Sequence, residues 1–207
     1  MTNQQVKTSS RYSHFTRVIL VCVLTLIGIG LSGWSTNLFS HSVANAASAS
    51  PLATQVPIKV FFSKYPDSVN KNFAAVFPVN RTSPTVAVGT FAVQLLIAGP
   101  TLDERHAGYF SELNSMLSGP SNCATPLPIA GPDFRLTLNK KGSHNAPGTT
   151  TLQFCRAITS AGIGSDARVQ AAIDATLKQF PTIKHVVILT KDGRCFADES
   201  GQDRCLR

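Results

Sequence analysis

One uninterrupted apolar segment, Val18 to Trp34, constrains this 207-residue chain more than any other feature. It is about 17 residues long, which at about 1.5 Å per residue barely reaches across a bilayer. Lys7, Arg11 and Arg17 precede it, and no acidic residue occurs before Asp67. This charge asymmetry holds an N-terminus in the cytoplasm. The rest of the chain is therefore expected outside the cytoplasm, in the periplasm or cell envelope or secreted.

The apolar segment fits a cleaved signal peptide better than a permanent helix, because three glycines and a serine weaken its second half. Small residues follow at 43–47, and we expect cleavage between Ala46 and Ala47. Residues 1–46 would then be the signal peptide, 47–56 a linker and 57–207 a single domain. The alternative is an uncleaved anchor that associates with the inner membrane through residues 18–34, which the long spacer before the cleavage site favours.

The charge of the exported part is mildly basic. Removing residues 1–46 takes away three of the 19 basic residues and none of the 11 acidic ones, so the net charge falls from +8 to about +5. Such a balance suits an anionic surface, for example a membrane or an acidic cell-wall polymer. The basic residues are scattered singly without interleaved aromatic residues, so nucleic-acid binding is not expected.

Four cysteines follow the N-terminal segment, an even number that predicts two disulfides in an exported chain. Three connectivities are open to four cysteines. The favoured one joins Cys195 to Cys205 across a short polar loop, which leaves Cys123 and Cys155 as the second pair. Closing the short loop would stabilise the fold by about 2 to 3 kcal/mol.

We expect neither a metal nor a cofactor. The cysteine spacings contain no Cys-x-x-Cys pair, and no histidine lies close enough in the sequence to complete a zinc site. The carboxylates near the C-terminus could attract calcium, but they lack the spacing of an EF-hand and are more simply a solvated loop. These carboxylates are Asp192, Asp198, Glu199 and Asp203.

Hydrophobic periodicity predicts alternating strands and helices. The strands are expected near 57–63, 73–79, 134–139, 152–155 and 185–189, and the helices near 85–98, 101–108 and 165–180. The strand at 185–189 is apolar on both faces, as a central strand covered by helices would be. The pattern predicts an α/β (α+β) sandwich in which two main helices pack on one mixed sheet of about five strands, with disulfides as staples.

The ends and faces of the helices are also predicted. Thr101 and Glu104 have the spacing of a capping box. Ser165 is expected to cap the last helix, with Arg168 facing outward. The segment from 140 to 148 would form a long polar tip between two strands of a hairpin.

Three segments of the chain share a pattern with a known family. They are Phe77-Pro-Val-Asn-Arg81, Ala92-Val-Gln-Leu-Leu-Ile-Ala-Gly-Pro-Thr101, and the stretch from Val169 to Val187. Together they resemble the GerM-type sporulation and germination (GerMN) domain, over about residues 56–193. The residues that match the family motif are Arg81, Leu95, Gly99, Pro100, Thr101, Glu104 and Gly108.

This resemblance implies a cell-envelope module without enzymatic activity. Such a module would contact peptidoglycan or an envelope protein, or assemble with further copies of itself. The alternative is a cysteine transpeptidase, because the segment Thr151-Leu-Gln-Phe-Cys-Arg156 is similar to the sortase signature. Cys155 would then be the nucleophile, His106 the base and Arg156 the oxyanion support. A cysteine held in a disulfide cannot attack, so we predict no catalytic residue.

Overall fold

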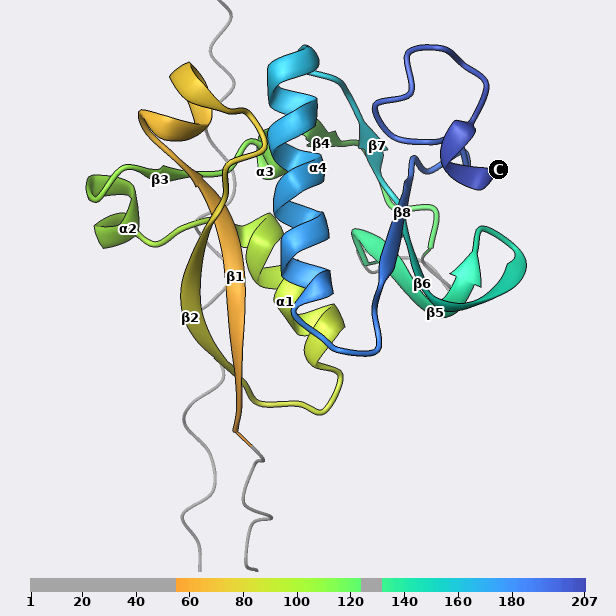
Figure 1. Cartoon of the computed structure of the whole chain (residues 1–207), viewed down its shortest axis with the longest axis horizontal. Helices are drawn as coiled ribbons and strands as arrows, with labels where there is room; N and C mark the ends of the chain where they lie inside the picture. The colour runs from red at the N-terminus through yellow and green to blue at the C-terminus, as the bar shows by residue number, and fades with distance from the viewer. Residues whose placement is uncertain (1–54, 124–131) are drawn as a thin grey trace, which may run out of the picture. The chain divides into compact units, whose positions relative to one another are not determined.

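The computed structural model of the protein describes residues 55–123 and 132–207 (Figure 1). The expectations for the apolar segment and for cleavage between Ala46 and Ala47 lie outside these residues. Within the described ranges, no helix combines the length and the apolar composition needed to cross a membrane.

The first sheet is built on strand β1 (Val56–Lys64). It pairs antiparallel with β2 (Phe77–Ser83) and, at its end, with β3 (Tyr109–Phe110). The predicted inward alternation is confirmed, since Ile58, Val60 and Phe62 are buried. The short π-helix η1 (Asp67–Lys71) follows β1.

The second strand begins four residues later than the predicted 73–79. Residues 72–75 form a turn instead, in which the backbone N–H of Ala75 donates to the carbonyl of Asn72 at 3.0 Å. The side chain of Asn72 accepts from the N–H of Ala74 at 2.9 Å. Asparagine favours such local turns over a strand.

A second sheet contains β5 (Phe134–Lys141), β6 (His144–Phe154) and β8 (His185–Leu189). β6 lies in the middle, antiparallel to β5 and parallel to β8. The predicted long polar tip is wrong, because both strands continue to a tight turn at Gly142. A bulge at Asn139 absorbs the change of register, and its side chain accepts from the N–H of Gly148 at 3.0 Å.

The prediction that 185–189 is a central strand is also wrong. β8 lies at the end of the strand order β5-β6-β8. One of its faces joins the main core through Ile188, and the other packs on the C-terminal loop through Val187 and Leu189. Its outer edge is partly covered, because the N–H of Phe196 donates to the carbonyl of Ile188 at 2.9 Å. The strand is apolar on both faces because a loop, rather than a helix, covers the second one.

Two long helices, α1 (Val88–Ala98) and α4 (Ile163–Lys178), lie between these two sheets (Figure 1). α1 has only two polar side chains, and a helix that is apolar all round must be covered on more than one side. Its Gly89 approaches β5 so closely that an added Cβ would lie 3.2 Å from Leu136. The expected single sheet of about five strands is therefore corrected to three small sheets, because the helices separate the two larger ones.

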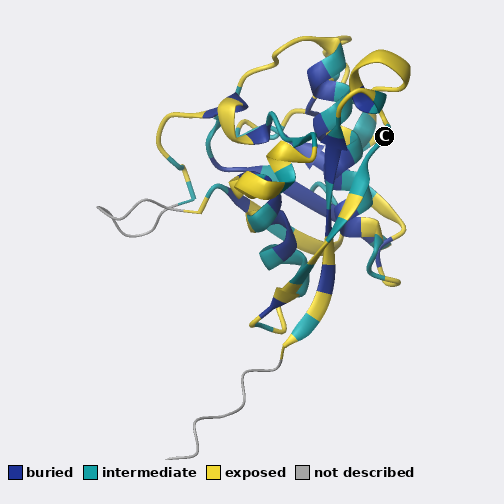
Figure 2. Ribbon diagram, turned by 90° about the vertical axis from the view of Figure 1, so that its left-hand side faces the viewer, coloured by how far each residue is buried: buried dark blue, intermediate teal, exposed yellow. Residues whose placement is uncertain are grey.

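The remaining elements are short. α2 (Leu102–His106), α3 (Leu113–Met116) and the pair β4 (Leu117–Ser118) with β7 (Ala157–Ile158) connect the layers, and the 3-10 turn η2 (Arg204–Leu206) ends the chain. The buried residues of both sheets and both long helices form one continuous core (Figure 2).

The last long helix differs from its prediction at the start and on one face. Val169, Ile173 and Leu177 are buried as expected. However, α4 begins at Ile163, and Ser165 does not cap it but donates its hydroxyl to a carboxylate on another element. Arg168, predicted to face outward, has a side chain only 11% exposed.

Candidate functional site

A groove of about 510 Å³ opens at the carboxyl ends of β6 and β8, the parallel strands that α4 connects. It is lined by residues that follow β6, by the first turn of α4, and by the segment that follows β8. In α/β units, ligands bind outside the carboxyl ends of parallel strands. The volume also falls in the range of about 300 to 1,000 Å³ that is typical of small-molecule sites.

Asp166 is the buried polar group of this groove. Its side chain lies in the first turn of α4 and the residue is only 4% exposed. Oδ2 accepts a hydrogen bond from the hydroxyl of Ser160 at 2.6 Å, while Oδ1 has no hydrogen-bond partner among the described residues. An unsatisfied buried acceptor costs about 1 to 3 kcal/mol. The positive end of the helix stabilises the negative charge at this position.

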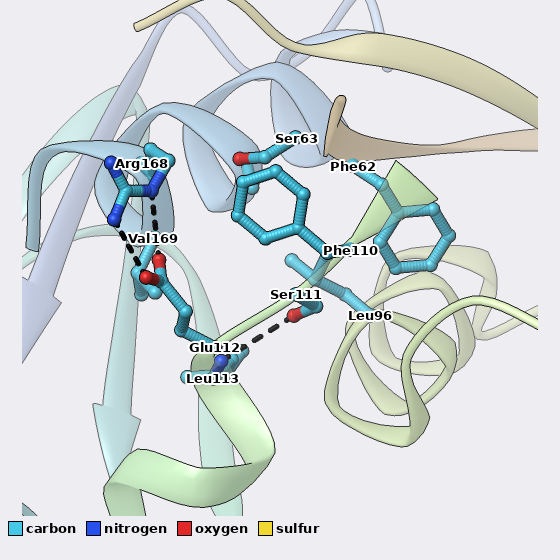
Figure 3. A pocket seen from close by; sticks show the side chains of 10 residues that line it. Phe62, Ser63, Leu96, Phe110, Ser111, Glu112, Leu113, Arg168 and Val169 are labelled. Atoms are coloured by element: carbon cyan, nitrogen blue, oxygen red, sulfur yellow. Dashed lines mark hydrogen bonds and ion pairs between the residues drawn. The ribbon is translucent and has the colours of Figure 1, made fainter. Parts of the chain in front are cut away.

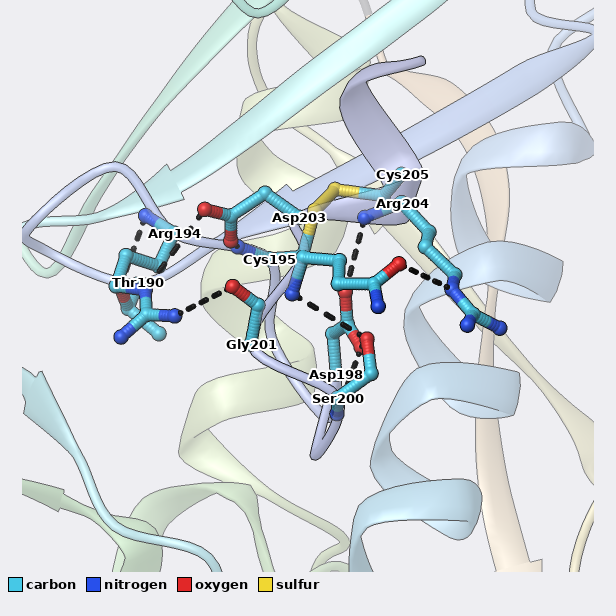
Figure 4. A network of polar contacts seen from close by, with 10 residues as sticks. Thr190, Arg194, Cys195, Asp198, Ser200, Gly201, Asp203, Arg204 and Cys205 are labelled. Atoms are coloured by element: carbon cyan, nitrogen blue, oxygen red, sulfur yellow. Dashed lines mark hydrogen bonds and ion pairs between the residues drawn. A yellow bond between two sulfur atoms is a disulfide. The ribbon is translucent and has the colours of Figure 1, made fainter.

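The C-terminal loop, residues 195–205, forms one side of the groove and is held by its own polar contacts (Figure 4). Cys195 is bonded to Cys205, and its N–H donates to Asp203 Oδ1 at 2.8 Å. Asp198 accepts from the hydroxyl of Ser200 and, at 2.9 Å, from the N–H of Arg204. These hydrogen bonds, that from Ser200 above all, lower the pKa of Asp198. The loop therefore keeps a defined shape.

The second disulfide joins Cys123 to Cys155, so the connectivity is the one that the sequence favours. Cys155 is fully buried and lies directly after β6, two residues before the groove lining begins at Ala157. One disulfide thus lies in one side of the groove, and the other lies just before the opposite side.

Carboxylates outnumber basic groups around the groove. Asp166, Asp192, Asp198 and Glu199 line it, against Lys191 and Arg194. The side chain of Arg194 is already engaged, since it donates to the carbonyl of Gly201 at 3.0 Å. The groove is therefore locally acidic on a chain whose overall charge is positive.

Ligand atoms of Cys195, Asp198 and Asp203 lie within 4.8 Å of one another, as in a metal site. The sulfur of Cys195 is not a thiolate, however, because it belongs to a disulfide. Both carboxylates already accept hydrogen bonds from backbone N–H groups. The internal contacts of the loop account for this cluster without a cation.

A second polar centre joins α3 to α4 (Figure 3). The guanidinium of Arg168 forms two hydrogen bonds with Glu112, at 2.9 and 2.6 Å, and Ser165 adds a third at 2.8 Å. Burial raises the pKa of Glu112, but the hydrogen bonds from Arg168 and Ser165 outweigh it, so that the pKa lies below its ordinary value. The hydrogen bond with Glu112 also raises the pKa of Arg168.

The space around this centre is too small for a ligand. A cavity of about 10 Å³ remains beside Glu112, enough for at most one water molecule. The ring centroids of Phe73 and Phe110 lie 5.4 and 5.8 Å from the guanidinium carbon of Arg168, so that both rings cover the guanidinium group. The centre is a structural clamp. Sequence reasoning missed it because the two partners are 56 residues apart and no motif spacing connects them.

Three of the residues that carry the resemblance to the GerMN domain, Arg81, Thr101 and Glu104, form another structural clamp, and none of them lines the groove. Arg81 on β2 binds Glu104 of α2 through two hydrogen bonds of 2.7 Å. The predicted capping box is confirmed, since Thr101 and Glu104 exchange hydrogen bonds at both positions. The hydrogen bonds from Arg81 lower the pKa of Glu104 most, against a smaller opposing effect of burial.

Two motif glycines adopt backbone conformations that other residues rarely tolerate. Gly99 has φ +83° and ψ −179° directly after α1. Gly108 has φ +90°, and an added Cβ would lie 3.3 Å from the carbonyl oxygen of Tyr65. Pro100 between them is buried and accepts from Arg105 at 2.6 Å, and Leu95 packs half-buried against the core.

The three residues proposed for a transpeptidase have other positions. Cys155 has no free thiol, because it is bonded to Cys123. Arg156 donates to the carbonyl of Gly119 at 3.0 Å and pairs with Asp133 at 3.1 Å. His106 is exposed in the last turn of α2, and no described hydrogen bond joins it to Cys155 or Arg156. The guanidinium of Arg156 therefore connects Gly119 with Asp133.

Comparisons with known proteins return two similar solved structures. One contains the tandem GerMN domains of the sporulation protein GerM from Bacillus subtilis, with 17% identity and a TM-score of 0.36 over 74% of this chain. This chain spans about half of that structure, 48% of its length. The other is a Clostridium perfringens protein designated a lipoprotein, with 14% identity and a TM-score of 0.26 over 68% of this chain and 77% of that one. The first match is to the family that the sequence resembles. No family model and no curated protein matches.

Proposed function

We propose that this protein is an exported, non-catalytic cell-envelope module that binds peptidoglycan or an envelope protein through the groove at the ends of β6 and β8. The observation that carries the proposal is the groove itself, whose lining includes Cys195 of one disulfide and begins at Ala157, two residues after Cys155 of the other. Disulfides are typical of proteins that fold in an oxidising compartment, outside the cytoplasm. A site that is rigid before binding loses little conformational freedom when a ligand enters.

A binding experiment on the exported protein tests this proposal. The purified protein is sedimented with isolated peptidoglycan, and in parallel cross-linked to envelope proteins in intact cells. Glu199→Trp places a bulky ring at an exposed position of the groove lining. We expect it to weaken binding by at least about tenfold, the equivalent of 1.4 kcal/mol.

The matched control is Gln170→Trp, at an exposed position of α4 outside the groove lining, which should bind as the native protein does. If native protein and Glu199→Trp retain the same partners equally well, the groove is not the binding surface. If neither peptidoglycan nor any envelope protein is retained, the proposed function is wrong.

A further inference from the structure

We infer that the groove takes a short peptide that carries an ammonium group and a carboxylate, and that Asp166 binds the ammonium group. This inference rests on the proposed function and names the class of ligand for the same groove. It begins with Oδ1 of Asp166, a buried carboxylate oxygen without a partner among the described residues.

A carboxylate oxygen can only accept a hydrogen bond, so the missing partner of Asp166 must be a donor. Among the described residues, one side-chain donor reaches this carboxylate, the hydroxyl of Ser160, and it binds the other oxygen. A buried carboxylate interacts more strongly with a charged donor than with a neutral one. An ammonium group satisfies both the free acceptor and the negative charge.

The charges around the groove select the same ligand. Asp192, Asp198 and Glu199 add negative charge to that of Asp166, and like-charge repulsion disfavours a polyanion here. An acidic groove attracts and orients a cation. This argues against the anionic cell-wall polymers that the overall positive charge of the chain would suit.

The position of Lys191 indicates that the ligand also carries a carboxylate. This lysine lines the groove, and no described carboxylate forms an ion pair with its ammonium group. The other basic group of the lining, Arg194, is bound to Gly201 and lies 3.8 Å from Asp203. Among the described residues of the lining, one unpaired cation thus lies beside several carboxylates. This arrangement fits a peptide with both charges, for instance an unlinked stem peptide of peptidoglycan with a free lysine side chain.

The test uses the oxidised exported protein and the tetrapeptide L-Ala-γ-D-Glu-L-Lys-D-Ala, labelled with a fluorophore at its N-terminus. The label leaves the lysine as the only ammonium group of the probe. Fluorescence anisotropy compares this probe with the same peptide acetylated on the lysine. We expect acetylation to weaken binding by at least about tenfold.

Asp166→Asn should remove this difference between the two probes, because an amide no longer offers a charged acceptor. Asp174→Asn, on the same helix but paired with Lys178 outside the groove lining, should keep it. Equal binding of the two probes by native protein overturns the inference. So does a folded Asp166→Asn variant that still prefers the free amine.

If Asp166→Asn does not fold, the inference is tested instead by amide chemical shifts of the native protein, measured by NMR with each peptide. The free peptide, and not the acetylated one, should shift the resonances of Ser160 and Asp166, and shifts confined to other regions overturn the inference. An all-L peptide with the same lysine distinguishes a protein source of the ammonium group from a cell-wall source. Retention of peptidoglycan without any effect of acetylation would overturn this inference and leave the proposed function intact.

Discussion

Glu104 serves two elements with one carboxylate, because it caps α2 and also binds Arg81 on β2. Both side chains of the pair are more than four-fifths buried. Arg81→Ala should therefore destabilise the protein by about 1.5 to 3 kcal/mol, the range for hydrogen bonds to charged groups. Urea denaturation of the native and variant proteins measures the difference.

The control for this prediction is Lys71→Ala, which breaks an ion pair on η1 whose lysine side chain is 70% exposed. Exposed pairs contribute about 0 to 1 kcal/mol, so this variant should change the stability little. Equal losses for the two variants would show that the clamp between Arg81 and Glu104 contributes no more than a surface pair.

Two carboxylates with lowered pKa values predict how stability depends on pH. The pKa values of Glu104 and Glu112 both lie below the ordinary value of 4.5 in the folded protein. A depressed folded-state pKa contributes stability above the unfolded value, and this stability is lost as the pH falls through the folded value. The free energy of unfolding should therefore decrease as the pH falls below about 4.5.

The double variant Glu104→Gln with Glu112→Gln should show a flatter decrease over the same pH range. Glu199→Gln is the matched control, because Glu199 is exposed and forms none of the described ion pairs. Chemical denaturation between about pH 3 and 7 measures the free energy of unfolding of each protein as a function of pH. A double variant with the slope of the native protein would contradict the prediction.

The two clamps show which residue contacts a sequence can predict. Thr101 and Glu104 are three positions apart, and the backbone of a helix start brings this spacing together by itself. Glu112, directly before α3, and Arg168 on α4 are 56 residues apart and meet only in the folded protein, and neither residue lies in a recognisable pattern. Ser165 does not cap α4 because the helix begins two residues earlier, at Ile163, and its hydroxyl binds Glu112 instead.

At the scale of elements, the type of each long segment could be predicted, but not how the segments combine. The apolar pattern of β8 predicts a central strand, whereas in the structure the C-terminal loop covers its second face. Hydrophobic periodicity indicates that one face of a strand or helix is buried, but it does not indicate which element covers that face. The groove was not predicted for the same reason, since its lining comes from segments that meet only through the pairing of β6 with β8.

The disulfides should contribute unequally to stability. Cys195–Cys205 closes 10 residues, whereas Cys123–Cys155 closes 32. By chain entropy, the shorter loop contributes about 3 kcal/mol and the longer one about 4 kcal/mol. Double serine variants of each pair, compared by urea denaturation after secretion, should follow this order.

The loss of each disulfide should also differ in its effect on binding. Removing Cys195–Cys205 should loosen the loop that carries Asp198 and Glu199, and so reduce retention of the partner even where the core remains folded. A variant without this disulfide that binds as the native protein does would show that the loop is not part of the binding surface.

For the whole molecule, the number of free thiols depends on whether the N-terminal segment is cleaved. All four cysteines of the domain are paired, and Cys22 lies in the expected signal peptide. The exported protein, denatured without reduction, should therefore show no reactive thiol after cleavage at Ala46, and one, Cys22, where the segment remains as an anchor. N-terminal sequencing, which should start at Ala47, separates the two forms. Because both disulfides form only in an oxidising compartment, more than one reactive thiol in protein recovered from the envelope would contradict the exported route on which the proposed function depends.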